Sequence, residues 1–379
     1  MSNSFVTCKE IAREALPLLV EECSLLPLIY RGYDEAFTHK KGDTIQVQKP
    51  TRGDTVDGSA DISSGYQDVG DDPVEVTLDT QRAYPVSLSS QEMTLNLDSF
   101  TRQISLPAMS AIAKYINGAL LDLYVDIPYF VGTSGNTPDA LDDLANSRKM
   151  LNNNLAPRGN RACIFDNDAD AKFLALDSLV EVDKAGTNQA LRNAALGQVY
   201  GMILASDGEV KTHTAGGYTA LADVTCTAGA AEATSIELTS AAGTSTAKLE
   251  NGDIFTLDGY QYVVTAQTAA ASSGVIAAVT IYPGLHDAYG DMDSDAVTFA
   301  DVSAGAHVAN LAFHKNAFAL AMAMLEPARG AESATASYKG VAMRVVQDYL
   351  FGTDKHVIRF DVLFGVKTMY PELATRLLG

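Results

Sequence analysis

The sequence predicts a mixed α+β fold into which a small antiparallel β unit is inserted. Strand-like alternation of apolar and polar residues occurs near both ends of the chain. A long helical stripe runs from about residue 106 to residue 127. Between about residues 214 and 310 the composition changes abruptly to Ala, Gly, Ser and Thr, with short and closely spaced strand-like runs.

The chain is long and apolar enough to bury a sizeable core. It has 379 residues, of which 47% are hydrophobic, so we expect more than one domain. Its formal net charge of −20 argues against a protein that grips nucleic acid through a broad basic face, because phosphate binding needs clustered Lys and Arg.

The sequence has no pattern typical of secretion or of a membrane span. Its longest apolar runs, such as GVIAAVTIYPGL, are shorter than a bilayer requires, and no signal peptide opens the chain. The cysteines lack both CxxC spacing and the spacing of a secreted disulfide framework, which indicates reduced thiols in a cytosol. They are Cys8, Cys23, Cys163 and Cys226.

An amphipathic helix is predicted near the N-terminus. Thr7 and Glu10 have the spacing of a capping box, and Pro17 is expected to bend the helix. The apolar stripe of this helix consists of Ile11, Ala15, Leu16 and Leu19.

Two predicted strands enclose a long segment with little to bury. In KKGDTIQVQKP (40–50) Ile45 and Val47 alternate with Gln46 and Gln48, and the same alternation occurs in PVEVTLDT (73–80). The roughly 25 residues between these strands hold almost no large apolar side chains, whereas structureless loops of that length are uncommon in compact domains. Such an arm cannot offset its ordering entropy with its own surface, so we expect it to be ordered on another surface or to stay mobile.

Helices are predicted between this arm and the inserted unit. From Leu106 to Ile127 the apolar residues fall three and four apart, and the helix would span about 33 Å. Thr137 is predicted to cap a second helix that begins at Pro138, because acidic residues follow near its positive end. Shorter helices at about 166–179 and 187–197 and a strand at about 197–207 are expected next.

The stretch 214–310 has the pattern of a small antiparallel barrel or sandwich. Its strand-like runs are SIELTS, DIFTLDG, YQYVVTAQ and GVIAAVTIYP, separated by Gly-rich turns. It contains eleven acidic residues and a single basic one, Lys248, so its formal charge of −10 is half of the −20 of the whole chain. We interpret this segment as a separate unit inserted into the main domain.

After the insertion the earlier pattern returns. Two long strand patterns within VAMRVVQDYLFGTDKHVIRFDVLFGVKT are joined at Gly352 to Lys355, which predicts a hairpin.

The sequence contains no familiar catalytic motif. It has no G-x-S-x-G elbow, no P-loop, no H-E-x-x-H and no G-x-G-x-x-G after a strand. The histidines never fall at metal-ligand spacing, so we interpret each as a surface or hydrogen-bonded structural residue. We therefore expect no catalytic residue, no cofactor and no metal. The histidines are His39, His213, His286, His307, His314 and His356.

Two local motifs resemble known sites without meeting their requirements. The aspartates of GDMDSD are spaced like the start of a calcium loop, but Ala296 replaces the required glycine and Val302 the closing glutamate. A solvated acidic loop, or a contact with a basic patch on a neighbour, is the preferred interpretation. The RGD tripeptide at Arg52 to Asp54 matches an adhesion motif, and such short matches arise often by chance.

The order of these parts resembles the HK97-type major capsid fold of tailed bacteriophages, and more closely the P22-type coat proteins with an inserted β-barrel domain. The resemblance rests on AFTHKKGDTIQVQKPTRG at 36–53, NLAFHKNAFALAMAMLE at 310–326 and MRVVQDYLFGTDKHVIRFDVLFGVKTMYPELATRLL at 343–378. It implies a major capsid (coat) protein of a tailed double-stranded DNA bacteriophage, which self-assembles into an icosahedral shell around the genome.

The resemblance also divides the chain into parts. The insertion would be the accessory domain, which helps the monomer fold and can touch neighbouring capsomers. The implied parts are the N-arm (1–35), a peripheral-domain strand (36–48), the E-loop (49–82), the peripheral domain with its spine helix (83–133), the axial domain (134–213 and 310–340), the inserted β domain (214–309), and C-terminal strands shared by the axial and peripheral domains (341–379).

In this family the E-loop is a hairpin that lies across a neighbouring subunit, so the missing core of the arm would be supplied in trans. Its acidic residues would contact basic residues of the neighbouring subunit. Complementary charge would set the register between the two subunits more than their affinity. The residues themselves leave open a solvated loop within a monomer. The expected contact residues are Arg52, Asp54, Asp68, Asp71, Asp72, Glu75, Asp79 and Arg82.

The resemblance implies the partners as well. The chain would form pentamers and hexamers of the shell, with a scaffolding protein and a portal as partners, would contact packaged double-stranded DNA weakly and non-specifically, and would meet no membrane. It would be assembled in the cytoplasm of the bacterial host and reside in the virion. Some members cross-link through an E-loop lysine, but no lysine lies between Thr51 and Arg82, so we expect a non-covalent lattice.

Two other classes of protein remain as alternatives. A secreted β-rich adhesin or a phage tail protein would explain the Ala- and Thr-rich insertion, but it leaves the long helix and the missing signal peptide unexplained. A hydrolase with a divergent site would need a pocket with convergent titratable groups, and the sequence supplies none.

Overall fold

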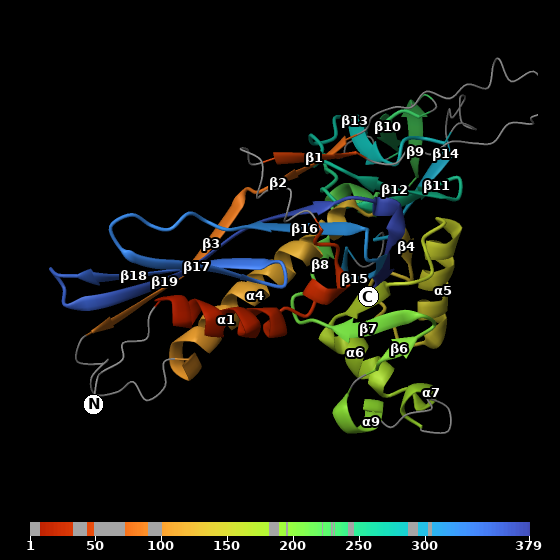
Figure 1. Cartoon of the computed structure of the whole chain (residues 1–379). Helices are drawn as coiled ribbons and strands as arrows, with labels where there is room; N and C mark the ends of the chain where they lie inside the picture. The colour runs from red at the N-terminus through yellow and green to blue at the C-terminus, as the bar shows by residue number, and fades with distance from the viewer. Residues whose placement is uncertain are drawn as a thin grey trace, which may run out of the picture. The chain divides into compact units, whose positions relative to one another are not determined.

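The computed structural model describes residues 8–32, 44–48, 73–89, 101–181, 189–194, 196–221, 223–228, 230, 232–241, 246–286, 295–301 and 305–379. Helices and strands are mixed along the chain, which confirms the α+β class (Figure 1). The chain divides into two compact units: the first comprises Met1–Val20, Arg31–Ile112 and Ala319–Met369, and the second comprises Glu21–Tyr30, Ala113–Phe318 and Tyr370–Gly379.

The first unit contains a five-stranded sheet. Its order is β16–β19–β18–β17, and β3 also pairs with β19. β18 and β19 form the predicted antiparallel hairpin, in which Leu350 lies opposite Lys355. The strands are β3 (Thr80–Ser89), β16 (Phe318–Ala323), β17 (Glu332–Tyr338), β18 (Val341–Leu350) and β19 (Lys355–Thr368).

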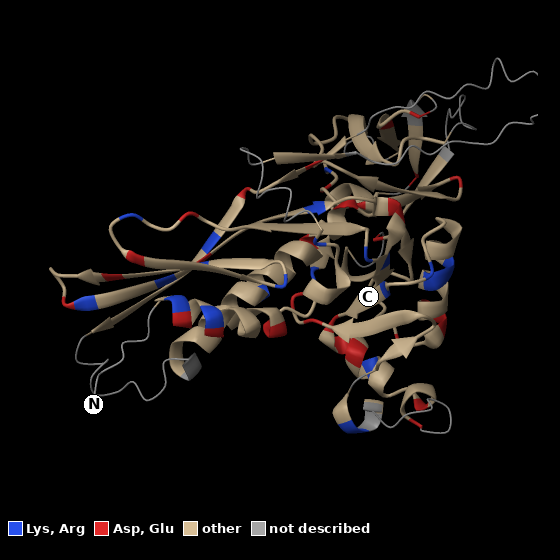
Figure 2. Cartoon of the chain, in the orientation of Figure 1, with Lys and Arg blue, Asp and Glu red and all other residues tan. Residues whose placement is uncertain are grey.

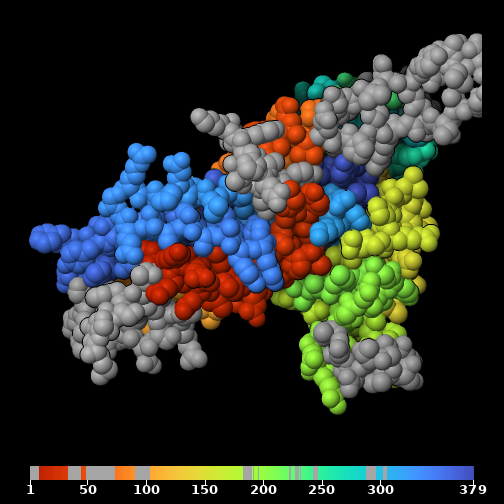
Figure 3. Space-filling model, viewed as in Figure 1, coloured from red at the N-terminus to blue at the C-terminus, as the bar shows by residue number. Residues whose placement is uncertain are grey.

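Helix α1 (Cys8–Glu22) is the predicted N-terminal helix, and its apolar stripe is buried as expected. The Cys8 thiol donates a hydrogen bond to the carbonyl oxygen of Glu332 in β17 at 3.5 Å. Figure 3 shows α1 in red against the blue C-terminal strands. Burial raises the pKa of Cys8 to about 11, so the thiol stays protonated at neutral pH. All four cysteines lie in the described part of the chain, where they are buried and form no disulfide. Their reduced state stays a prediction.

The long helix predicted over 106–127 ends earlier than expected. A π-helical turn, η2 (Thr101–Ser105), leads into α4 (Leu106–Leu121), and a 3-10 segment, η3 (Asp122–Asp126), follows. The backbone tightens there, and the Ile127 N–H bonds to the Tyr124 carbonyl oxygen three residues back at 3.0 Å. The prediction of one helix to Ile127 was wrong at this end because a spacing of three and four fits both kinds of helix.

The same helical stretch bears on the expectation about membrane spans. Gln103–Asp126 is long and apolar enough to cross a bilayer, with a mean hydropathy of 1.2, whereas no run of that length was expected. However, 61% of its most apolar window is buried inside the protein, as in the core helix of a folded domain. Length and composition are therefore weak evidence for a span here.

The second unit contains a seven-stranded sheet in the order β4–β20–β15–β5–β7–β6, with β8 also paired to β15. β5 is buried at every position and runs parallel to β7, as expected for a central strand covered on both faces. The strand predicted at 197–207 is a pair, β6 and β7. The strands are β4 (Phe130–Val131), β5 (Arg161–Phe165), β6 (Gln198–Val199), β7 (Met202–Ser206), β8 (Thr212–Thr214), β15 (Ala306–His314) and β20 (Ala374–Leu378).

Helix α5 (Leu141–Asn153) begins later than predicted, and Ala140 rather than Thr137 is its N-cap. The Asp143 carboxylate accepts a hydrogen bond from the Ala140 N–H at 3.2 Å, so an acid in the first turn satisfies this donor without a hydroxyl cap. The helix predicted over 166–179 is two shorter ones. The remaining helices are α6 (Asn167–Leu174), α7 (Asp177–Val180) and α9 (Gln189–Asn193), with 3-10 turns η1 (Leu26–Leu28), η4 (Gly217–Ala220) and η6 (Pro371–Leu373).

The inserted unit is a closed six-stranded antiparallel barrel, so of the two predicted forms the barrel is the one that occurs. Its interior is an apolar cluster of its own, which includes Tyr218, Phe255 and Tyr262. The four predicted runs form β10 to β13, whereas β9 and β14 were not predicted. The strands are β9 (Val224–Ala228), β10 (Ser235–Ser240), β11 (Ile254–Leu257), β12 (Tyr260–Val264), β13 (Val275–Tyr282) and β14 (Asp295–Phe299).

Candidate functional site

The root of the predicted arm is a separate two-stranded sheet. β1 (Thr44–Gln48) and β2 (Pro73–Thr77) pair antiparallel from Thr44–Thr77 to Gln48–Pro73, as the strand patterns predict. Ile45 and Val76 are buried on one face. Across the exposed face Gln46 donates a hydrogen bond to the Glu75 carboxylate at 3.1 Å. The pair thus brings together the two ends of the acid-rich segment 49–72, which lies outside the described residues.

Three of the eight expected contact residues lie in the described chain. Glu75 is on β2, Asp79 follows this strand and Arg82 is on β3, and all three are exposed. Asp79 accepts a hydrogen bond from the Thr80 hydroxyl at 2.8 Å. Their contact with a neighbouring subunit stays a prediction. Arg52, Asp54, Asp68, Asp71 and Asp72 lie outside the described residues.

The arm root lies directly on the five-stranded sheet through a glycine. A Cβ atom added to Gly365 in β19 would overlap the carbonyl oxygen of Thr77 and lie 2.8 Å from its carbonyl carbon. The backbones of β2 and β19 approach so closely that a side chain at this position does not fit. Gly365 therefore lets β2 lie against β19, a feature that the sequence patterns did not indicate.

The tip of the β18–β19 hairpin is an exposed apolar surface that the sequence reasoning missed. Phe351 is 91% exposed, Leu350 is 47% exposed and Tyr349 is 43% exposed. The Tyr349 hydroxyl donates a hydrogen bond to Asp354 across the turn at 2.8 Å. The run YLFG just before the polar turn is the sequence pattern that indicates this surface. Large apolar residues seldom cluster at a hairpin end that faces only water.

A buried carboxylate forms ion pairs within the sheet on which the arm root lies. Asp361 in β19 is fully buried, and its oxygens accept hydrogen bonds from the Arg344 Nη2 at 2.6 Å and the Arg359 Nε at 2.5 Å. Arg344 lies opposite Asp361 on β18. Figure 2 shows basic residues in blue on these strands. Because the buried charge is paired on both of its oxygens, it favours this strand register over a shifted one.

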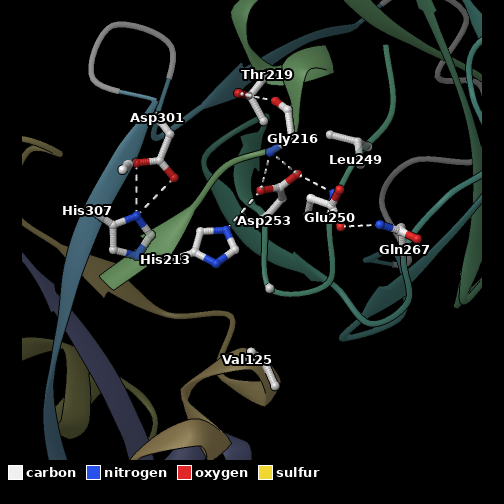
Figure 4. A network of polar contacts seen from close by, with 12 residues as sticks. Val125, His213, Gly216, Thr219, Leu249, Glu250, Asp253, Gln267, Asp301 and His307 are labelled. Carbon is white, nitrogen blue, oxygen red and sulfur yellow. Dashed lines mark hydrogen bonds and ion pairs between the residues drawn. The ribbon is translucent and has the colours of Figure 1, made fainter. Parts of the chain in front are cut away.

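A second charged cluster lies in the second unit (Figure 4). His213 Nε2 and Asp253 Oδ1 are 2.9 Å apart, and His307 Nδ1 lies 2.9 Å from both oxygens of Asp301. All four side chains are nearly or fully buried. Burial lowers the pKa of His307 despite its bond to Asp301. Burial also lowers the pKa of Arg376 to about 10, so this guanidinium stays charged at neutral pH.

Two hydroxyl groups lie beside these histidine–aspartate pairs. The Ser134 hydroxyl donates to Asp301, and the Tyr124 hydroxyl lies 3.1 Å from His213 Nδ1. Among the described residues no group of three His, Cys, Asp or Glu side chains could hold a metal ion. His213, His307 and His314 are buried and hydrogen-bonded, as expected for structural histidines. The RGD tripeptide and most of the GDMDSD loop lie outside the described residues.

Comparisons with known proteins found resemblance only to solved structures. No family model matches the chain, and no curated protein does. A structure from Mycobacterium phage Che8 is 13% identical, with a TM-score of 0.49 over 92% of this chain and 89% of that one. The capsid of Ralstonia phage GP4 is 9% identical, with a TM-score of 0.46 over 89% and 83%. The capsid of a native GTA particle is 8% identical, with a TM-score of 0.47 over 94% and 90%.

Proposed function

We propose that this chain is the major capsid protein of a tailed double-stranded DNA bacteriophage, and that its copies assemble into an icosahedral shell around the genome. In this proposal the protein works by assembly and needs no catalytic step. The closed inserted barrel supports a place among P22-type coat proteins.

The observation that carries the proposal is the strand pair at the arm root together with the segment into which it leads. β1–β2 hydrogen-bonds to no other strand of the described chain, and such a pair is marginally stable in water without a surface to pack on, which the close approach of β2 to β19 supplies. The pair leads into residues 49–72, which hold six aspartates and only small apolar side chains beyond Val56, Ile62, Tyr66 and Val69. Such a segment needs a surface supplied by another molecule, and a neighbouring copy supplies one in every position of a closed shell.

The net charge of the chain is compatible with the DNA partner in this proposal. A net charge of −20 disfavours tight contact with DNA, so a packaged genome would be touched weakly and non-specifically. Pentamers and hexamers of the chain would form the shell with a scaffolding protein and a portal as partners. Glu75, Asp79 and Arg82 are exposed at the arm root, where a neighbouring copy would contact them.

Electron microscopy of the protein tests the proposal most directly. The chain is expressed alone and together with the neighbouring genes of its source, and each preparation is measured by negative stain and by light scattering after size exclusion. Shells or capsomer-sized rings are the expected result. A monomer in both preparations that binds a small ligand or turns over a substrate would refute the proposal, and a fibrous β-rich assembly would favour the tail-protein alternative.

The shell is expected to be held together without covalent cross-links. No lysine is present from Thr51 to Arg82 to attack a side chain of a neighbouring arm. After boiling in denaturant, shells should therefore give a single band of the monomer mass of 40.2 kDa on a gel. A ladder of multimers that survives reducing agent would contradict this prediction.

The hairpin tip is expected to matter for assembly and not for folding. Phe351→Ser removes an aromatic ring that is 91% exposed, so the free energy of unfolding should change by no more than about 0.5 kcal/mol. Shell yield, measured by sedimentation, should fall because the ring would pack against another copy.

Phe351→Met is the matched control for the tip, because it keeps an apolar side chain of similar length. This variant is expected to retain most of the shell yield. Equal yields from Phe351→Ser and the wild type would show that the tip makes no assembly contact.

A further inference from the structure

The barrel is inserted between two strands that pair with each other. β8 leads into the barrel and β15 leads out of it, and His213 on β8 lies directly opposite His307 on β15. The two imidazole ring centres are 5.1 Å apart. The chain therefore enters and leaves the barrel at one place, and both histidines lie there.

The barrel and the seven-stranded sheet have largely separate apolar cores. The barrel interior is a closed cluster of its own. The apolar cluster shared with the sheet is small and consists of Ile254 and Val263 from the barrel and Leu378 from β20, with partly buried residues around them. Among the described residues this shared apolar cluster is small, which leaves the polar contacts a larger share of the junction.

Each histidine bonds to an aspartate of the barrel. Asp253 lies just before β11, and besides His213 it accepts hydrogen bonds from the N–H of Gly216 at 3.2 Å and of Glu250 at 2.8 Å. Asp301 lies just after β14 and bonds to His307. Figure 4 shows both aspartates directed at the ring of their histidine. The bonds join the strands of the sheet to one end of the barrel, because β11 and β14 pair with Phe255 opposite Phe299 and so place Asp253 and Asp301 at the same end.

Arg376 completes the junction from the C-terminal strand. It is fully buried in β20, and it donates hydrogen bonds to the carbonyl oxygens of Gly252 at 2.8 Å and of Val125 at 3.4 Å. The Tyr124 ring lies beneath its guanidinium, with the centroid 5.1 Å away. Asp253 and Asp301 act on it electrostatically as counter-charges. One cation thereby links the barrel, the sheet and the 3-10 segment η3.

We propose that His213–Asp253, His307–Asp301 and Arg376 form a proton-sensitive clasp, which holds the barrel on the sheet at neutral pH and opens in mild acid while the barrel itself stays folded. The geometry of His307 makes the clasp sensitive. Its Nδ1–H donates to Asp301, and its buried Nε2 has no hydrogen-bond partner among the described residues. A proton added at Nε2 would be a buried donor without an acceptor, which destabilises the closed state.

The charges around His307 set the sign of the pH effect. Burial is the largest cause and lowers the pKa of His307. Arg376 and His213 also disfavour a positive charge on the His307 ring, whereas Asp301 favours it. The groups that face the clasp are Asp301 after β14, His213 on β8, Asp253 before β11, Tyr124 and Asp126 on η3, and Arg376 on β20.

The pH window follows from these directions. Above the ordinary histidine pKa of about 6.5, His307 is neutral in the closed and the open state, so the clasp keeps its full stability. Below that value the open state takes up the proton first, and the closed state loses stability until pH passes the lowered pKa of His307. Burial raises the pKa of Asp301, but bonds from His307 and Ser134 hold it below its ordinary value, so its contribution is lost only below about pH 4.

Hydrogen exchange of the full-length chain between pH 7.5 and pH 5 tests the proposal. Amides of β8 and β15 at His213 and His307 report on the clasp, and those of β11 and β12 report on the barrel core. After correction for intrinsic exchange, clasp exchange is expected to speed up by up to about tenfold per pH unit below 6.5. The barrel amides should keep their protection. Equal loss of protection in clasp and barrel, or no change in either, would overturn the proposal.

A matched pair of variants separates His307 from other titrating groups. His307→Asn keeps a donor for Asp301 but cannot take up a proton, so the acid-dependent rise in clasp exchange should be lost. His286→Asn removes a histidine that is exposed on the barrel surface, and it should exchange like the wild type. An unchanged rise in His307→Asn would overturn the assignment, and the wild-type measurement stands if this variant fails to fold.

Discussion

Replacing Arg376 with methionine is expected to destabilise the second unit by about 3–5 kcal/mol, the usual cost of breaking a buried charge arrangement. Methionine fills much of the same volume, but it leaves the carbonyl oxygens of Gly252 and Val125 without their donor. It also leaves two buried carboxylates, Asp253 and Asp301, without the cation. Urea unfolding followed by circular dichroism would measure the loss as a lower transition midpoint.

Arg329→Met is the control for this prediction, since Arg329 is exposed and its replacement should cost no more than about 0.5 kcal/mol. A variant Arg376→Lys tests the shape of the cation. It keeps the charge but reaches one carbonyl at a time, so an intermediate loss is expected. If Arg376→Met unfolds at the same urea concentration as Arg329→Met, the guanidinium does not hold this junction together.

The second large effect is expected from Gly365→Ala at the arm root. The added methyl would overlap the backbone of Thr77, which cannot move aside as the end of a side chain does. We expect a loss of about 1–3 kcal/mol, typical of overpacking, together with a shift of β2 away from β19. Exchange of the Val76 amide should quicken, and the yield of shells should fall because the arm would leave the sheet in another direction.

Gly159→Ala provides the control, because a Cβ at Gly159 meets no atom within 4 Å. It should leave both the Val76 exchange rate and the shell yield unchanged. A Gly365→Ala protein with wild-type exchange at Val76 would mean that β2 tolerates the methyl. Normal shell yield together with fast exchange of the Val76 amide would instead show that the position of the arm root does not affect assembly.

Local sequence patterns predicted an element correctly where the spacing of its apolar residues decides between helix and strand. The apolar stripe of α1 and the alternation in β18 and β19 depend on neighbours a few residues away, and these elements occur as predicted. The same logic failed at helix ends. The 3-10 segment after Leu121 and the cap of α5 depend on single hydrogen bonds that a hydrophobic pattern does not encode.

The sequence by itself determined the α+β class, the acidic stretch of short strands within residues 214–310 and the absence of a familiar catalytic motif, because composition and periodicity are properties of short stretches. Only the tertiary structure decided that the insertion closes into a barrel, that β9 and β14 complete it, and that Gly365 touches Thr77. It also placed His213, His307, Asp253, Asp301 and Arg376 together. Such contacts join residues far apart along the chain, and their register follows from how whole elements pack, so no local pattern carries them.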